Sequence, residues 1–296
     1  MRLTVICCAV LAAAVLVPVA SASQLIDRNA THVSLRVNAK GEALLTYKTG
    51  TKLKRVLAWG AVNAIPPNQS RPQVKFKLDY SGGYGKYHNA HYYLIFNGSC
   101  LKYDGPPLSW EVAACKAPDG SYWALQSWQR ALPDYGVAPN ATQSVWELRL
   151  SHWTGELPAL SIQMDWSYRK FDQLFGTYTY GGVPVFGFKS TSGGEPLDTY
   201  GRNIYVDTFN SAYGAGWKRD NSFLTHKSTG AFCYGFYPHA GHPAGNGEKY
   251  RATAEGPGVA PDVTWMGNAP GPYDKTADAT ANDAIKALND PSCKPN

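Results

Sequence analysis

Residues 146–166 read WELRLSHWTGELPALSIQMDW, and this stretch carries the clearest structural pattern of the chain. Apolar side chains alternate with polar ones from Trp146 to Leu150 and again from Leu160 to Trp166. Alternation with a period of two residues is typical of a strand with one buried face, and the Gly- and Pro-containing segment between the runs is typical of a turn. The stretch therefore predicts a β-hairpin.

The register of this hairpin follows from matching its apolar faces, because a slip of one residue would bury the polar set. A turn centred at Glu156 pairs Trp146 with Trp166, Leu148 with Met164 and Leu150 with Ile162 on the buried side. It also sets Glu147 opposite Asp165 on the other side. We expect the Cβ atoms of these two carboxylates to be about 5 Å apart.

The rest of the chain repeats the alternating pattern, with Gly, Pro and Asn between the runs. Strands are expected at 33–37, 43–48, 74–80, 108–114, 121–128, 144–153, 159–168, 174–180, 183–189, 202–209, 230–237, 248–255 and 262–266. A short helix is expected at 279–288, and 88–96 is a weaker candidate. The predicted fold class is all-β: an antiparallel β-sandwich or jelly-roll-like fold of about a dozen strands with one short C-terminal helix.

We expect one domain over residues 23–267, followed by a tail, 268–296, that carries the helix and is tied back by a disulfide. The segment 133–139, PDYGVAP, could instead be a linker between two domains, but its length is also that of an ordinary loop.

The first 22 residues have the organisation of a secretory signal peptide. Arg2 supplies a positive start, residues 3–17 are almost entirely apolar, and a small-x-small cleavage site ends at Ala22. The apolar run is shorter than the about 20 residues that a membrane helix needs. We therefore expect cleavage after Ala22, a secreted, extracellular protein and no membrane span.

Four cysteines lie beyond this leader, at positions 100, 115, 233 and 293. An even number in an oxidising compartment predicts a disulfide framework, for which three pairings are possible. Because loop closure favours neighbours, we expect Cys100 to pair with Cys115 and Cys233 with Cys293. The alternative, Cys233 as a nucleophile, requires an unpaired thiol.

The formal net charge is +6, and loss of Arg2 with the leader makes it +5. The basic residues are scattered, and their densest cluster is KLKR at 52–55. Nucleic-acid binding requires a basic stripe or patch, so we expect no nucleic-acid partner. A weak attraction to an anionic cell-wall polymer is compatible with this charge.

The expected proximity of Glu147 and Asp165 makes them weak catalytic candidates. Two such carboxylates can act as acid and nucleophile in retaining glycoside hydrolysis, because their repulsion raises the proton affinity of one. The alternative is an ordinary solvated sheet face with Arg149 nearby to neutralise both. No G-x-S-x-G elbow is present, so residue types alone do not support a Ser-His-Asp triad.

Two H-x-x-H spacings occur, His88 with His91 and His239 with His242. Such a pair could bind one metal ion, but neither has the Glu of H-E-x-x-H, and a third ligand would have to come from elsewhere in the chain. The commoner place for such histidines is a surface loop. We therefore assign no metal and no cofactor.

The segment richest in ligand-recognition residues is 198–221, DTYGRNIYVDTFNSAYGAGWKRDN. Sugars are bound by aromatic rings that stack on their C–H faces and by planar polar groups that hydrogen-bond their hydroxyls. Alternation over 202–209 places Tyr205 and Asp207 on one face. The ligand-binding candidates are Tyr200, Arg202, Tyr205, Asp207, Asn210, Tyr213 and Trp217.

These observations favour a secreted protein that binds extracellular glycan or cell-envelope polysaccharide, without covalent chemistry of its own. One alternative is an extracellular polysaccharide hydrolase that uses the paired carboxylates. Another is a structural or adhesive protein whose aromatic residues all belong to the core. Because the β-sandwich architecture serves lectins, glycosidases and adhesins alike, the fold does not choose among them, and whether the protein is an enzyme stays open.

Overall fold

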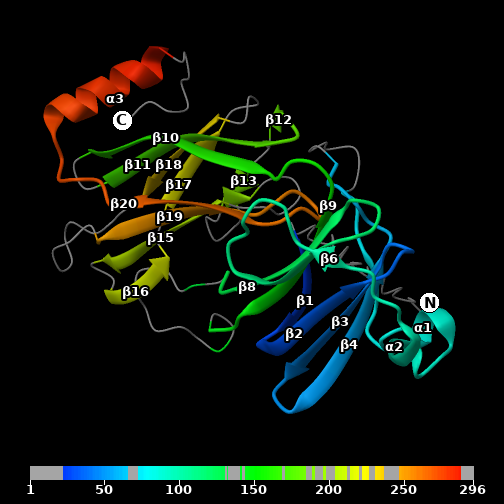
Figure 1. Ribbon diagram of the computed structural model, residues 1–296. Coiled ribbons are helices and arrows are strands. Elements are labelled where there is room, and N and C mark those ends of the chain that lie inside the picture. The colour runs from blue at the N-terminus through cyan, green and yellow to red at the C-terminus, as the bar shows by residue number, and fades with distance from the viewer. Residues whose placement is uncertain are drawn as a thin grey trace, which may run out of the picture.

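The computed structural model describes residues 23–65, 73–130, 132, 141, 144–168, 171–184, 189–190, 196–197, 204–211, 214–219, 222–226, 231–236 and 247–287. These residues form 20 strands and three helices (Figure 1). Every pair of neighbouring strands among them is antiparallel. The predicted all-β, antiparallel class with a short C-terminal helix is confirmed.

Four larger sheets and one small sheet contain these strands. Sheet A has the order β1 (Gln24–Arg28), β9 (Glu147–Trp153), β8 (Tyr122–Trp128), β7 (Glu111–Lys116) and β6 (Leu101–Lys102). Sheet B has the order β2 (Ala30–Val37), β3 (Glu42–Thr49), β4 (Lys52–Trp59) and β5 (Lys77–Asp79). Sheet C has the order β16 (Gly214–Arg219), β15 (Ile204–Ser211), β19 (Lys249–Ala254) and β20 (Val263–Asn268). Sheet D has the order β10 (Ala159–Tyr168), β11 (Phe171–Tyr180), β18 (Ala231–Phe236) and β17 (Ser222–His226), with β12 (Val183–Pro184) on β11. The small sheet pairs β13 (Lys189–Ser190) with β14 (Pro196–Leu197).

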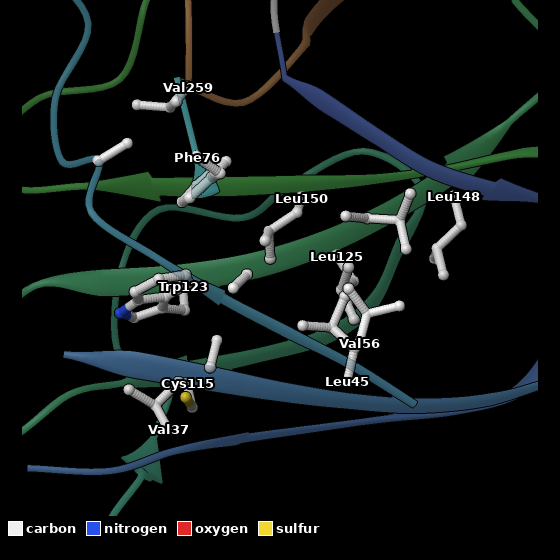
Figure 2. Packing of buried hydrophobic residues seen from close by; sticks show 14 of the residues in the cluster. Val37, Leu45, Val56, Phe76, Cys115, Trp123, Leu125, Leu148, Leu150 and Val259 are labelled. Atoms are coloured by element: carbon white, nitrogen blue, oxygen red, sulfur yellow. The ribbon is translucent and has the colours of Figure 1, made fainter. Parts of the chain in front are cut away.

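Sheets A and B share one hydrophobic core. In β3, Leu45 faces this core while Leu44 faces the opposite side, as strand alternation requires. Figure 2 shows Leu125 of β8 and Val56 of β4 pointing toward each other between the two sheets. The buried members are Ile26, Val37, Ala43, Leu45, Tyr47, Val56, Ala58, Ala61, Phe76, Cys115, Ala117, Trp123, Leu125, Leu148, Leu150 and Val259.

Sheets C and D share a second core. Tyr178 of β11 and Tyr250 of β19 are its largest fully buried side chains, together with Phe232 of β18. The other buried members are Ala64, Leu174, Tyr180, Ile204, Val206, Ala252, Ala254 and Ala260.

The helices cover the outer faces of two sheets. Near α1 (Tyr84–Tyr87), Tyr92 of α2 (Tyr92–Ile95) packs with Leu44 and Leu57 on the far side of sheet B. On sheet D, Ala281 of α3 (Lys275–Ala287) is buried in a cluster with Trp166 and Phe175 (Figure 1).

A buried carboxylate fixes the α1–α2 segment to sheet B. Glu42, only 3% exposed, receives hydrogen bonds from Asn38 Nδ2 at 2.8 Å and Tyr92 Oη at 2.9 Å, and pairs with Lys86 Nζ. The Tyr87 hydroxyl also contacts it. Burial alone would raise the pKa of this carboxyl, but its hydrogen bonds, led by the one from Lys86, lower it to about 2.

The connection between β19 and β20, residues 255–262, is buried throughout and joins the two cores. Val259 lies in the core of sheets A and B, whereas its neighbour Ala260 lies in the core of sheets C and D. Backbone N–H of His152 in β9 donates to the Val259 carbonyl at 2.9 Å. The Asp262 carboxylate accepts a hydrogen bond from Trp128 Nε1 at 3.1 Å. These contacts favour the single domain predicted for 23–267, which remains a prediction.

The predicted hairpin is wrong. β9 pairs with β1 and β8 in sheet A, so both of its edges are occupied, and β10 pairs with β11 in sheet D. Trp146 is 48% exposed and Trp166 is 5% exposed. A register shift between Ile162 and Met164 also reverses the faces of β10, so that Ile162 packs on the C–D core and Trp166 lies in the α3 cluster.

The predicted C-terminal helix exists, but it begins at Lys275 because Asp274 caps it: Asp274 Oδ1 accepts a hydrogen bond from Ala277 N at 2.7 Å. The weaker helix candidate, 88–96, is represented by α2, and His88 ends α1 in a left-handed conformation. Strands β1, β4, β6, β14, β16 and β17 were not predicted.

One predicted disulfide is confirmed: Cys100 is bonded to Cys115, with Cα atoms 5.6 Å apart. Cys233 is also disulfide-bonded, so the alternative of a free nucleophilic thiol is wrong. Its predicted partner, Cys293, lies outside the described residues. Within the described ranges, no helix has the length and apolar character needed to cross a bilayer.

Candidate functional site

The predicted binding segment falls on β15 and β16 of sheet C. Three of its candidates, Tyr200, Arg202 and Tyr213, lie outside the described residues. The other four are described, and three of these, Tyr205, Asp207 and Trp217, lie on one face of the sheet.

The strand register arranges side chains in rows across this face, which we call the outer face of sheet C. It is opposite the C–D core because the alternate residues Ile204, Val206 and Tyr250 are core members. The first row is Trp217, Phe209, Lys249 and Asn268; the second is Arg219, Asp207, Arg251 and Met266; the third is Tyr205, Thr253 and Thr264. The end of the outer face formed by the first row is open to solvent, and we call it the open end. Lys249 and Asn268 are exposed there, and Trp217 is half-buried.

Asp207 is the electrostatic centre of the outer face. Its carboxylate is 0% exposed and receives Arg219 Nε on Oδ1 at 2.6 Å and Arg251 Nε on Oδ2 at 3.0 Å. A buried carboxylate requires such charge-assisted partners, because an unpaired charge would be strongly disfavoured in the protein interior. Asp207 thereby fixes the position of both guanidinium groups.

Planar side chains stack in a column that crosses from sheet C to sheet A. The Arg251 guanidinium lies 4.3 Å from the centre of the Trp217 ring and 5.2 Å from that of Trp110. Trp110 in turn stacks on Trp128 at 4.5 Å, with 9° between the planes. Cation–π and ring stacking of this kind stabilise both partners and hold the Arg251 guanidinium near both indoles.

Trp110 reaches this position through an unusual backbone conformation, with φ of 54°. Bulky residues rarely adopt left-handed φ, and such strain, on the order of 1 to 3 kcal/mol, often marks functional sites. The conformation is held by the hydrogen bond from Ser127 N to the Trp110 carbonyl at 2.9 Å and lies next to a register shift in β7.

The inner end of the outer face joins a buried ion-pair network. The Arg219 guanidinium lies 4.0 Å from the Tyr205 ring centre, and Tyr205 Oη donates to Glu255 Oε1 at 3.0 Å. Glu255, only 2% exposed, also pairs with Arg130, which approaches Glu147 at 3.6 Å. The network connects sheet C to the first residue of β9 in sheet A.

Asn210, the remaining described candidate, has a local structural role. It adopts a left-handed φ of 51° at the register shift between Phe209 and Ser211 in β15, its Oδ1 accepts from Gly216 N at 2.9 Å, and its Nδ2 donates to Glu248 Oε1 at 3.1 Å. Its side chain is exposed. These bonds connect the end of β15 to β16, the strand that carries Trp217, and to Glu248 next to β19.

The two weak catalytic candidates are not brought together. Glu147 lies in sheet A, where Arg149 Nη2 and Arg28 Nη2 contact its oxygens at 2.6 and 3.4 Å. Burial would raise the pKa of Glu147, but these arginines lower it. Asp165 is exposed on β10 of sheet D, and its Oδ2 accepts a hydrogen bond from the Tyr250 hydroxyl.

The carboxyl group that does lie near Asp165 is that of Asp172, which was not among the residues predicted from the sequence. Asp172 is 1% exposed, and its Oδ1 accepts from Ser167 Oγ at 2.7 Å, while Oδ2 has no hydrogen-bond partner among the described residues. Burial, and secondarily the charge of Asp165, raises the pKa of Asp172 to about 7, against the Ser167 hydrogen bond. A substrate could not reach so buried a carboxyl group.

A serine, a histidine and an aspartate also meet on sheet A. His152 Nδ1 contacts the Ala61 carbonyl, so it carries a proton, and burial lowers the pKa of His152 to about 4, so the ring is neutral. Ser121 Oγ then donates its single proton either to Nε2 at 2.9 Å or to Asp119 Oδ1 at 2.6 Å. Asp119 contacts the serine and not the histidine, and Ser121 is 1% exposed, so this is not a catalytic triad.

The histidine motifs form no metal site in the described ranges. His88 and His91 flank the short helices, and the described chain holds no group of three His, Cys, Asp or Glu residues suited to a metal ion. His239 and His242 lie outside the described residues.

Comparison with known proteins returned no matching family model, no similar curated protein and no similar solved structure.

Proposed function

We propose that the protein is secreted and binds extracellular glycan or cell-envelope polysaccharide, and that the outer face of sheet C is its ligand surface. The observation that carries this proposal is the half-buried Trp217 ring at the open end of an ordered stack of planar side chains. Such a ring can stack on the C–H face of a sugar, while Lys249 and Asn268 in the same row can hydrogen-bond its hydroxyls.

The test is a glycan array that includes cell-wall polysaccharides, followed by titration of any bound glycan. Trp217→Ala should weaken binding by about 1 to 3 kcal/mol, as truncation of a hot-spot ring does, and should lower the melting temperature by only a few degrees, because the stack with Arg251 is a modest stabilising contact. Trp146→Ala is the matched control, because Trp146 is an exposed indole on the other half of the molecule. If no glycan on the array is bound, or if the Trp217→Ala variant unfolds without a specific loss of binding, the structural or adhesive alternative is favoured.

Secretion is supported by the leader-like first 22 residues and by the Cys100–Cys115 disulfide. Mass spectrometry of the exported protein should give a chain that begins at Ser23 and has no free thiol. A chain that keeps its leader, or one that reacts with a thiol reagent without prior reduction, contradicts this part of the proposal.

The hydrolase alternative has less support. Glu147 is paired with arginines, and the carboxyl near Asp165 is buried, so the described residues offer no pair of accessible carboxylates at this position. Release of reducing ends from cell-wall material would nevertheless reverse the preference.

A further inference from the structure

One edge of the Arg251 guanidinium, formed by Nη1 and Nη2, is not engaged by the described residues. Its Nε donates to Asp207, and its Cζ lies 4.3 Å from the ring centre of Trp217 and 5.2 Å from that of Trp110. No described residue accepts a hydrogen bond from Nη1 or Nη2, and the side chain keeps 10% of its surface exposed. The pair of N–H groups on a guanidinium edge matches the two oxygens of a carboxylate or phosphate.

The outer face of sheet C carries a net positive charge, which also suits an anionic ligand. Its three rows contain the cations Lys249, Arg219 and Arg251 but a single carboxylate, Asp207, which is shared by both arginines. The exposed Lys249 lies beside the open end of the stacked column, in the same row as Trp217. An acidic ligand would therefore meet a net positive surface next to a ring suited to sugar stacking.

We propose that the outer face of sheet C binds acidic glycans and that the Nη edge of Arg251 receives their oxyanion, a sugar carboxylate or a phosphate ester. This inference rests on the proposed glycan-binding function and names the class of glycan. A sugar ring stacked on Trp217 would carry its acidic group to Arg251, which contacts the same indole.

The experiment compares ligands that differ only in charge. Wild-type protein is titrated with polygalacturonate and with its fully methyl-esterified form, and in a second pair with phosphorylated and unmodified dextran. The acidic member of a pair should bind at least about tenfold more tightly, the value of one charge-assisted bidentate contact, and added salt should reduce this preference. The pair that shows the preference identifies the oxyanion as carboxylate or phosphate.

Arg251→Lys keeps the charge but loses the planar fork, so it should lower the acidic-to-neutral ratio several-fold while leaving the part that comes from the net positive charge of the face. Because both ligands are measured on the same sample, partial unfolding cannot mimic a change in this ratio. Arg28→Gln is the control, since it removes an exposed charge from sheet A and should leave the ratio unchanged. Equal binding of acidic and neutral forms, or an unaltered ratio in Arg251→Lys, overturns the inference alone; no binding to any glycan overturns the proposed function as well.

A second, independent observation concerns Ser23 at the start of the described chain. Ser23 is 0% exposed, its Oγ lies 3.2 Å from both oxygens of Asp262, and its carbonyl accepts from Arg149 Nη1 at 2.9 Å. Asp262 is 1% exposed, and no cationic side chain of the described residues forms an ion pair with it, although its charge acts on that of Arg149 from a longer distance. A buried carboxylate of this kind is expected to have a positive partner.

The geometry points to the mature N-terminus as that partner. Hydrolysis of the Ala22–Ser23 bond by a signal peptidase adds water, leaves a carboxylate on Ala22 and frees an ammonium group on Ser23. Only Cα and Cβ separate this nitrogen from the Oγ that already contacts Asp262. The new ammonium group then forms an ion pair with Asp262, so that removal of the leader stabilises the junction between sheet A and the buried connection.

The test compares the full mature chain beginning at Ser23 with a chain beginning one residue earlier, at Ala22. The Ser23 start should raise the melting temperature by about 2 °C or more, and the difference should vanish in the Asp262→Asn background. Equal melting temperatures, or a difference that persists without Asp262, overturn the inference.

A second readout covers the case in which Asp262→Asn does not fold. Amine-reactive labelling of the Ser23 α-amino group should be slower in the folded protein than in urea, by about tenfold for each unit by which the ion pair raises its pKa. Equal labelling rates contradict the ion pair. Neither measurement depends on glycan binding.

Discussion

Asp207 and Arg251 face each other across the β15–β19 ladder, and the carboxylate accepts the Arg251 Nε hydrogen at 3.0 Å. The two residues are 44 positions apart in the chain, so tertiary folding alone brings them together. Both are buried, which makes their interaction sensitive to loss of either partner.

Asp207→Asn should destabilise the protein by roughly 3 to 5 kcal/mol, because it leaves two buried guanidinium groups without a counter-ion. Urea denaturation followed by tryptophan fluorescence measures the change. Asp104→Asn is the control, since Asp104 forms an exposed pair with Lys116 and should matter little. A loss for Asp207→Asn no larger than for Asp104→Asn would contradict this account of the outer face.

Asp172 should make the protein less stable as the pH rises from about 4 to about 7. Its folded pKa of about 7 lies above the ordinary value of 3.8, so in this window the folded state binds a proton that the unfolded state has lost. Asp172→Asn, which resembles the protonated form, should therefore gain stability relative to wild type with rising pH, by up to about 4 kcal/mol above pH 7. Chemical denaturation from pH 4 to pH 8 measures the difference, and a constant difference is the contrary result.

The two tryptophans Trp123 and Trp146 should differ sharply when truncated. Trp123 is fully buried and stacks on His152 at 3.7 Å, so Trp123→Ala should lower the free energy of unfolding by about 3 to 5 kcal/mol. Trp146 is exposed, and its replacement by Ala should change stability by less than about 1 kcal/mol. Equal losses in thermal or urea unfolding would place Trp146 in a core after all.

The alternating pattern predicted the strand content well but not the partners of the strands. Nothing local in residues 146–166 shows that β9 is enclosed by β1 and β8, because one of these partners lies more than 100 residues away. The register shift after Ile162 is equally invisible, since a bulge leaves the sequence alternation intact while it exchanges the two faces.

The candidate site could be predicted in part. Alternation was sufficient to place Tyr205 and Asp207 together, and the stacked ring of Trp217 belongs to the same segment. Arg251 and Trp110 could not be found, because they reach the site through the β15–β19 pairing and through packing of sheet A on sheet C. An isolated arginine in an alternating strand carries no local sign of such a role.

The buried connection at residues 255–262 has a consequence for how the chain folds while it is being synthesised. A chain emerging N-terminus first can assemble β1 to β9, but that first half lacks Val259 and the carboxylate that receives Trp128 until residue 262 has been delivered. The unfinished half would expose apolar surface during that interval and be prone to aggregate. We therefore expect either half, produced alone by cutting the gene between the cores, to be less soluble than the whole chain.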